Sequence, residues 1–373
     1  MKFTTAGESH GRCLLGILEG IPAGLPLSES DINPDLKRRM GGYGRGGRMK
    51  IESDAAEILT GIFRGKTIGA PISVMIENKD WQLKKDLPVI NYPRPGHADL
   101  AGLLKYDETD IRAISERASA RETAARVAVG AIAKRFLAEF GIDILGVVTE
   151  IGGIAASPKL LSIKDLREVS EASPLGMANG EKENEIIELI DRCKEEGDSL
   201  GGAFTVIAEG VPCGLGSHSQ WDERLDAELA RAIISIQAMK AVEIGEGMAN
   251  ARRKGSEAHD QIGYHKEGFF RHSNHAGGTE GGISNGEPIV VTAYMKPISS
   301  IHKPMASIDM KTKEEGKSHY QRSDVTAVTP ARVVGEAMVA LVLATFFLKK
   351  FGGDSMTEVK RNYQSYLEHV KTR

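Results

Sequence analysis

Residues 38–50 combine arginine and glycine in a way that suits the binding of a small, highly charged anion. Five of these thirteen residues are cationic, four of them arginine, and five are glycine. Arginine presents a planar fork of donors that fits carboxylates and phosphates two bonds at a time, and glycine lets the backbone come close to a ligand. A solvated, flexible basic loop is the alternative interpretation, and this segment alone does not decide between the two.

Other short segments place ionisable side chains beside glycine, alanine or serine. They hold Ser9 and His10, Arg94 and His97, Ser119 and Arg121, and Arg322 and Asp324. Each also has a structural interpretation, such as a helix ion pair for Arg121 or a helix cap for Asp324. Histidine titrates near neutrality and suits proton transfer. Several arginines, two histidines and one aspartate in such settings favour a site that binds an anion and moves protons.

The elements that must position these residues alternate between strand-like and helix-like patterns. The predicted strands lie at 13–20 and within 57–77, and the predicted helices at 28–39, 109–140 and 183–196. The periodicity of the apolar residues and the capping residues carry these predictions. The long region 109–140 is rich in alanine, which allows close packing. An α/β protein follows.

The second half of the chain repeats short patterns of the first half in the same order. The matching pieces are 19–25 and 209–215, 61–62 and 282–283, and 125–127 and 331–333. Recurrence of this kind indicates two related halves, at about 1–145 and 200–353, within a single domain of residues 1–373. Binding sites often form where such halves meet.

Composition and charge argue against several classes of protein. The net charge is −3, so nothing global draws the chain to nucleic acid or to an anionic membrane. Its three cysteines lie far apart, which suggests a reducing compartment. The N-terminus has no apolar signal-like region, and the longest apolar run, 333–348, is expected to be a buried helix too short to span a bilayer. We therefore expect a cytoplasmic protein with neither a nucleic-acid nor a membrane partner.

Some pattern matches have simpler interpretations. Residues 42–47 satisfy GxGxxG, but no buried strand precedes them and no helix pattern follows. Residues 61–67 resemble a P-loop that is one residue short, and we predict a turn there. The RGG fragment at 45–48 is single, whereas RNA-binding RGG segments are repeated. We expect no metal, but a mobile loop over a site, where histidines lie at 259, 265, 272 and 275.

Six motifs, in this order along the chain, resemble those of the chorismate synthase family. They occupy 7–11, 38–39 with 44–48, 94–99, 116–123, 276–286 and 322–324. The resemblance covers essentially the whole chain. It implies a β-α-β sandwich of two related halves, with a helical layer between antiparallel-rich sheets, and a homotetramer.

The resemblance also implies an activity. The family converts 5-enolpyruvylshikimate 3-phosphate to chorismate by a 1,4-anti elimination of phosphate and a ring proton, in the shikimate pathway of aromatic amino-acid biosynthesis. It needs reduced FMN although there is no net redox change, and we expect NADPH to serve only as an outside or weak reductant. The substrate carries two carboxylates and a phosphate, so several arginines would be needed to hold it.

Roles for single residues are carried over from the family's motifs. His10 would serve the leaving phosphate, His97 would lie close to the flavin, and Asp324 would help to remove the ring proton. The substrate would be held by Ser9, His10, Arg39, Arg45, Arg48, Arg94, Arg121 and Arg322. Flavin contacts are implied for Arg39, Arg45, His97, Ser119, Ala120, Arg121, Gln237, Ala238, Gly281, Lys296, Pro297, Ile298, Ser299, Ser300 and Arg322. Many relatives are expected to have Asn at 237 and Gly at 241, where this chain has Gln and Ala.

Two other functions compete with this interpretation. A nucleic-acid-binding protein would use the Arg/Gly segment and would bind RNA in a salt-sensitive manner, but it gives no reason for Asp324 or the two histidines. A phosphate-releasing lyase without flavin would explain the arginines, but not the segments rich in Gly and Ala that the resemblance assigns to flavin.

Overall fold

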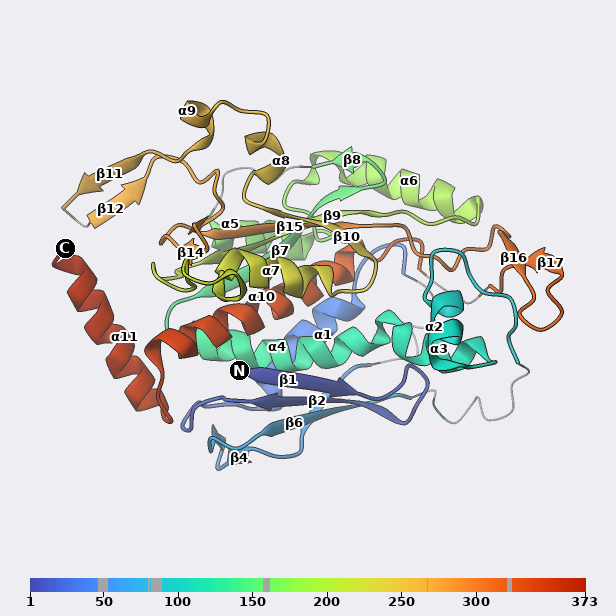
Figure 1. The fold of residues 1–373 in the computed structure, drawn as a ribbon, viewed down its shortest axis with the longest axis horizontal. Coiled ribbons are helices and arrows are strands. Elements are labelled where there is room, and N and C mark those ends of the chain that lie inside the picture. Colours follow the sequence, from blue (N-terminus) through green and yellow to red (C-terminus); the bar gives the residue numbers. More distant parts are fainter. Residues whose placement is uncertain (46–52, 80, 82–88, 157–161, 267, 321–323) are drawn as a thin grey trace.

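Two antiparallel sheets face each other across a layer of helices in the computed structural model (Figure 1). The structure describes residues 1–373 except 46–52, 80, 82–88, 157–161, 267 and 321–323. The first sheet has the order β1 (Lys2–Ala6), β2 (Cys13–Glu19), β6 (Ile72–Glu77), β3 (Ala56–Ile58). The second has the order β10 (Met239–Ile244), β15 (Ile289–Met295), β9 (Gly202–Glu209), β7 (Asp143–Ile151), β8 (Ile154–Ala155).

The helical layer consists mainly of α4 (Thr123–Ala138) and α10 (Val328–Phe351), with α1 (Asn33–Met40) beside them. Helix α4 packs against β2 and β6 of the first sheet, while α10 packs against β7 and β9 of the second. All neighbouring strands within the two sheets pair antiparallel. The predicted sandwich, with helices between antiparallel-rich sheets, is therefore confirmed.

The remaining elements surround this sandwich. The other helices are α2 (Asp99–Tyr106), α3 (Ile111–Ala118), α5 (Ile163–Ala172), α6 (Glu183–Glu195), α7 (Leu225–Ile234), α8 (Gly247–Asn250), α9 (Gly255–Ala258) and α11 (Met356–Lys371). The short 3₁₀ helices are η1 (Glu29–Asp31), η4 (Ala120–Glu122), η5 (Gly180–Lys182) and η6 (Trp221–Glu223). Hairpins are formed by β4 (Ile62–Phe63) with β5 (Lys66–Thr67), β11 (Ile262–His265) with β12 (Gly268–Arg271), β13 (Thr279–Glu280) with β14 (Ile283–Ser284), and β16 (Ala306–Ile308) with β17 (Glu315–Lys317).

The two central helices cross at a position where only glycine fits. A Cβ atom added at Gly130 of α4 would lie 2.3 Å from the Cβ of Ala337 in α10 and 2.9 Å from its carbonyl oxygen. Small residues at a helix crossing let the backbones approach closely, and protein interiors are packed too densely to absorb an extra methyl group without displacement. The alanine-rich composition predicted for this region serves this packing.

Helix α10 is longer than the apolar run from which it was predicted. It spans 24 residues, and among the described residues it is the helix long and apolar enough to cross a membrane. The expectation that the run 333–348 is too short for a bilayer is therefore wrong as to length. However, 83% of its most apolar window is buried inside the protein. Its buried Glu336 forms ion pairs with Arg38 and Lys134, and its buried Arg332 donates to the carbonyl of Gly146. It is the buried core helix that the sequence predicts.

A matching hydrogen-bonded arrangement occurs in both halves of the chain. The hydroxyl of Thr67 donates to the carbonyl of Pro22 at 2.6 Å and accepts from the amide of Leu25 at 2.9 Å. The hydroxyl of Ser284 makes the same two bonds, at 2.6 and 2.8 Å, with the proline and leucine that follow β9. The strand orders β1-β2-β6-β3 and β7-β9-β15-β10 also correspond. The pseudo-repeat stays a prediction, which these correspondences support.

A further pair of hydrogen bonds changes which glycine of the second half corresponds to Gly61 of the first half. The carbonyl of Gly61 accepts from the amide that follows β5, and the carbonyl of Gly278 accepts from the amide that follows β14. Gly278, rather than Gly282, therefore takes the place of Gly61. Arg64 and Gly65, both with positive φ, form the tight turn of the β4–β5 hairpin, so the turn predicted in place of a P-loop at 61–67 is present.

The histidine-rich segment does not cover the cavity described below. Its described residues fold into α9 and the β11–β12 hairpin, which lies far from α2 and α3 in Figure 1. His265 stacks on Phe270 with ring centroids 5.0 Å apart, and His275 lies 3.0 Å from the carboxylate of Glu246. The expectation of a loop over a site is wrong here, because cross-strand and aromatic contacts order the segment into an arm.

Candidate functional site

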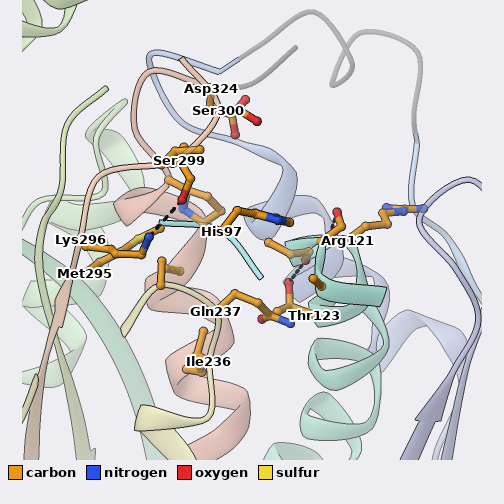
Figure 2. A pocket seen from close by; sticks show the side chains of 18 of the residues that line it. His97, Arg121, Thr123, Ile236, Gln237, Met295, Lys296, Ser299, Ser300 and Asp324 are labelled. Atoms are coloured by element: carbon orange, nitrogen blue, oxygen red, sulfur yellow. Dashed lines mark hydrogen bonds between the residues drawn. The ribbon is translucent and has the colours of Figure 1, made fainter. Parts of the chain in front are cut away.

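A cavity of about 470 Å³ opens where α4 and α10 begin (Figure 2). Its walls come from both halves of the chain: the end of α3 and η4, the segments before α2 and after α7, the segment after β15, and the first turns of α10. Predicted site residues that line it are Arg39, Arg45, Arg94, His97, Ser119, Ala120, Arg121, Gln237, Ala238, Lys296, Pro297, Ile298, Ser299, Ser300 and Asp324.

A break in the helical region 109–140 forms one wall of this cavity. The sequence predicts a helical region there, but α3 ends at Ala118, Ser119 is extended, and α4 starts only at Thr123. The side chain of Ser119 accepts a hydrogen bond from the backbone N–H of Arg121, so it caps the new helical turn. The sequence pattern does not reveal the break itself, at which this local cap competes with a continuous helix. The break turns Arg121 toward the interior.

Arg39 and Arg121 meet at one buried carboxylate. Nη1 of Arg121 contacts both carboxylate oxygens of Asp54 at 2.7 Å, and Arg39 approaches the same carboxylate at 3.5 Å. Arg39 also donates to Thr123 at 3.0 Å and to the carbonyl of Ala120 at 2.9 Å. Burial lowers the pKa of Arg39 to about 9, against the opposing charge of Asp54. Within the described part of the chain, two buried guanidinium groups thus share one carboxylate.

Arg94 and His97 are held by a second buried carboxylate. Asp99 accepts from Nε and Nη2 of Arg94 at 2.7 and 2.9 Å and from its backbone amide at 3.0 Å, and it also contacts Nδ1 of His97. Arg94 reaches Ser300 as well, at 2.9 Å. Burial works to raise the pKa of Asp99, but the hydrogen bonds from Arg94 and His97 outweigh it and hold that pKa well below its usual range.

This arrangement predicts how Asp99 affects stability with pH. Because the folded-state pKa is lowered, Asp99 stabilises the fold above the unfolded carboxyl pKa of roughly 3.9, and this contribution disappears as the pH falls through the folded value. Asp99→Asn should lower the free energy of unfolding at neutral pH by about 3 kcal/mol. Urea unfolding of both proteins from neutral pH to about pH 3 should show the difference shrinking in acid; an equal deficit at both ends would contradict the assignment.

Asp324 and Lys296 complete the polar wall. Asp324 lies 2.6 Å from Nη1 of Arg45, whose pKa is lowered by burial. Lys296 donates to Ser299 at 3.0 Å and to the carbonyl of Gly96 (Figure 2). Burial, and then the charge of Lys240, lower the pKa of Lys296. Among the described residues, five cationic side chains line the cavity, and they contact three carboxylates, of which that of Asp324 also lines it.

Ser9 and His10 lie beside the cavity rather than in its wall. The Oγ atoms of Ser9 and of the cavity-lining Ser119 are 3.2 Å apart. Nδ1 of His10 contacts the carboxylate of Glu116 at 2.6 Å. Gly281 lies in the turn of the β13–β14 hairpin and does not line the cavity. Arg48 and Arg322 lie outside the described residues.

Sequence reasoning missed the carboxylates and amides that hold the arginines. Asp54 has no local signal, because its partner Arg121 is 67 positions away. Asn78, which accepts from Nε of Arg121 at 2.9 Å, has none either. Asp99 and Glu116 lie within the quoted motifs but received no role. Their position close to Arg or His in a motif is the signal that could have found them.

The fold is a mixed α/β sandwich, and its cavity gathers cationic side chains of the kind that suit a small polyanion. A family model described as chorismate synthase matches residues 1–348. The chain is similar to the chorismate synthase of Aquifex aeolicus (strain VF5), 54% identical over 395 residues covering 100% of this chain and 98% of the relative. It is similar to that of Geobacter sulfurreducens, 52% identical over 390 residues covering 100% and 99%. A crystal structure titled chorismate synthase matches with a TM-score of 0.83 at 47% identity, covering 100% and 98%.

The chain therefore belongs to the chorismate synthase family. Its activity is that of a lyase in the shikimate pathway of aromatic amino-acid biosynthesis. The family match favours this activity over the two rival functions, a nucleic-acid-binding protein and a different phosphate-releasing lyase without flavin.

Proposed function

We propose that the arginine-lined cavity binds 5-enolpyruvylshikimate 3-phosphate next to reduced FMN and is where phosphate and a ring proton are eliminated to give chorismate. The observation that carries this proposal is that four arginines, His97 and Asp324 face one cavity. The substrate would be held by Arg39, Arg45, Arg94 and Arg121, with Ser9, His10, Arg48 and Arg322 as further proposed contacts.

The electrostatics of the cavity support binding of a trianion. Burial lowers the pKa values of Arg39 and Arg45 more than the charges of Asp54 and Asp324 raise them, so the cost of desolvating these cations is not fully balanced. A carboxylate or phosphate group from the substrate would restore that balance through paired hydrogen bonds. Preorganised donors in a site that excludes water also stabilise negative charge as it develops on a leaving group. The same arginines would therefore bind the substrate and promote release of phosphate.

The residues present fit a flavin. Part of the wall is apolar and built from small residues, which suits a flat ring: Ala118, Ala120, Ile236, Ala238, Ala327, Pro330, Ala331 and Val334. Gln237 also lines the cavity, and its Oε1 atom is buried with no hydrogen-bond partner among the described residues. A buried acceptor of this kind requires a donor, and a flavin ring carries N–H groups. The segment 296–300 and Ser119 supply polar atoms beside the apolar wall.

Three side chains are proposed to handle protons. Reduced flavin, when bound, supplies electron density and a basic ring nitrogen. Asp324 would accept or relay the ring proton, a task for which a lone carboxylate is a weak base. His97 would hold a proton at the flavin side of the cavity, and His10 would give one to the leaving phosphate. Gly281 remains a proposed flavin contact only by resemblance to the family.

The oligomeric state, the cellular compartment and the source of reduced flavin form a separate part of the proposal. We infer a homotetramer in the cytoplasm that receives reduced FMN from outside, with NADPH at most a weak or external reductant. FAD and NADP have no proposed site of their own among the described residues. Size-exclusion chromatography with light scattering measures the oligomer, and anaerobic incubation of the protein with FMN and NADPH measures any intrinsic flavin reduction.

The decisive experiment is anaerobic mixing of the protein with dithionite-reduced FMN and 5-enolpyruvylshikimate 3-phosphate. Chorismate and phosphate should form one to one, and only when reduced flavin is present. Tight substrate binding without product would leave the charge assignment intact and overturn the chemistry. Failure to bind either ligand would overturn both.

Substitution of Arg48 tests whether this residue binds the substrate rather than FMN. Arg48→Ala should weaken substrate binding by about tenfold to a hundredfold, because a lost charge-assisted hydrogen bond is worth about 1.5–3 kcal/mol. FMN binding should change much less. Isothermal titration with each ligand measures both affinities. An equal loss of both, or of neither, would contradict the assignment of Arg48 to the substrate.

A further inference from the structure

The end of α3 fastens the segment that carries Ser9 and His10. The backbone amide of Ser9 donates to the carbonyl of Glu116 at 2.9 Å. The backbone amide of His10 donates to Oε2 of Glu116 at 2.7 Å, and Nδ1 of the His10 ring lies 2.6 Å from Oε1. One residue of α3 thus contacts both members of the segment through its backbone carbonyl and both carboxylate oxygens. This segment also reaches the cavity wall through the contact between Ser9 and Ser119.

The contact between His10 and Glu116 decides which ring nitrogen carries the proton in neutral His10. An ionised carboxylate can only accept hydrogen bonds. Nδ1 must therefore be the protonated nitrogen wherever it bonds to Glu116, which leaves the lone pair of the neutral ring on Nε2. A carboxylate that fixes the tautomer and orientation of a histidine is a recurrent device in acid–base catalysis.

We propose that Glu116 is the positioning residue of His10 and makes Nε2 the nitrogen through which His10 exchanges protons. This inference rests on the proposed function, in which His10 protonates the leaving phosphate. The geometry supports it in two ways. Glu116 holds both the ring and the backbone of His10, and the side chains of both residues are largely shielded, with 15% and 24% of their surface exposed.

A double-mutant cycle and a spectroscopic measurement test this role. Glu116→Gln keeps the size of the side chain and an oxygen for the His10 amide, but its amide group can donate to Nδ1 and favour the other tautomer. We expect kcat to fall on the order of 100-fold with KM within a few-fold. In a His10→Ala background the same substitution should cost nothing further, because it acts through His10. Glu116→Asp should recover part of the loss.

The tautomer is read from the ¹⁵N shifts of labelled histidine at a pH where the ring is neutral. The signal absent in His10→Ala identifies His10. Wild type should show the Nδ1–H form, and Glu116→Gln should lose it. Retention of that form in Glu116→Gln, or an equal loss of kcat with and without His10, would overturn the proposal. The tautomer measurement needs no turnover, so it remains decisive even if the proposed function fails.

Arg117 offers a matched control on the same helix. Its guanidinium group holds the neighbouring segment through the carbonyls of Thr5 and Gly7, at 2.9 and 3.1 Å, without touching His10. Arg117→Met should loosen that segment but leave the His10 tautomer unchanged. A change of tautomer in this variant would show that general loosening of the loop, rather than the Glu116 carboxylate, sets the proton position, and would overturn the proposal.

Discussion

Asp324→Asn should lower kcat by about 10²–10⁴-fold while substrate affinity stays within a few-fold. Asparagine keeps the shape of the side chain and can still accept from Arg45, which lies 2.6 Å away, so the anion-binding arrangement should persist. It cannot accept a proton, however, and general acid–base assistance is commonly worth that factor. Anaerobic rapid mixing gives kcat, and titration of the unreacted protein with substrate gives the affinity.

Deuterium at the departing ring position sharpens this test. If Asp324 takes part in proton removal, that step should limit the variant, and a primary isotope effect should appear or increase. Arg45→Gln is the contrasting variant, because it should weaken substrate binding more than it slows turnover. Near-normal turnover in Asp324→Asn would remove Asp324 from the proposed catalytic set.

Glu336→Ala should destabilise the fold by about 3–5 kcal/mol. Glu336 is fully buried in α10 and accepts from both Nη atoms of Arg38 at 2.7 Å and from Lys134 and the amide of Gly146 at 2.8 Å. Removal of the carboxylate takes away the fully buried acceptor of Arg38 and Lys134 and leaves Asp35 as the carboxylate that both still contact, which costs more than the intact pair contributes. Guanidinium unfolding at neutral pH measures the loss.

An exposed ion pair provides the control for Glu336. Lys182 and Glu185 are also 2.7 Å apart, but about half of each side chain is exposed. Glu185→Ala should therefore change the stability far less than Glu336→Ala does. Similar losses in the two variants would mean that burial adds nothing to the Glu336 contacts. Burial works to raise the pKa of Glu336, yet the charges of Lys134 and Arg38 hold it well below its usual range, so its contribution should persist down to acidic pH.

The sequence predicts the arginines of the site well and their partners poorly. Arg39, Arg94 and Arg121 lie in motifs with glycine, alanine or serine, and all three line the cavity. Asp54 joins Arg39 and Arg121 only in the folded chain, so no local pattern could identify it. Arg38 looks like part of the same anion-binding segment, but it points to Glu336 in the core. Adjacent residues on a helix face different directions, and the charge pattern alone does not reveal which one turns inward.

The secondary structure is likewise predicted well from the sequence in some segments and poorly in others. Helix α6 and strand β2 agree with the predicted 183–196 and 13–20 to within a residue, because apolar residues and a following glycine with positive φ mark them. The break at Ser119 was not predicted, because an alanine-rich pattern favours an uninterrupted helix. At the break, the cap on the amide of Arg121 and the contacts of its guanidinium group with Asp54 are made together. Tertiary contacts of this kind override local propensity.

The crossing of α4 and α10 at Gly130 has a mechanical consequence for the cavity. Both helices begin at the cavity wall, about two turns from the crossing. A side chain at position 130 would push α4 away from Ala337 of α10. Because helices are stiff, the displacement would extend to the first turns of both helices and would widen the cavity that the arginines line. Gly130 does not line the cavity, but it should tolerate substitution poorly. Gly130→Ala should weaken ligand binding through the displacement of the two core helices.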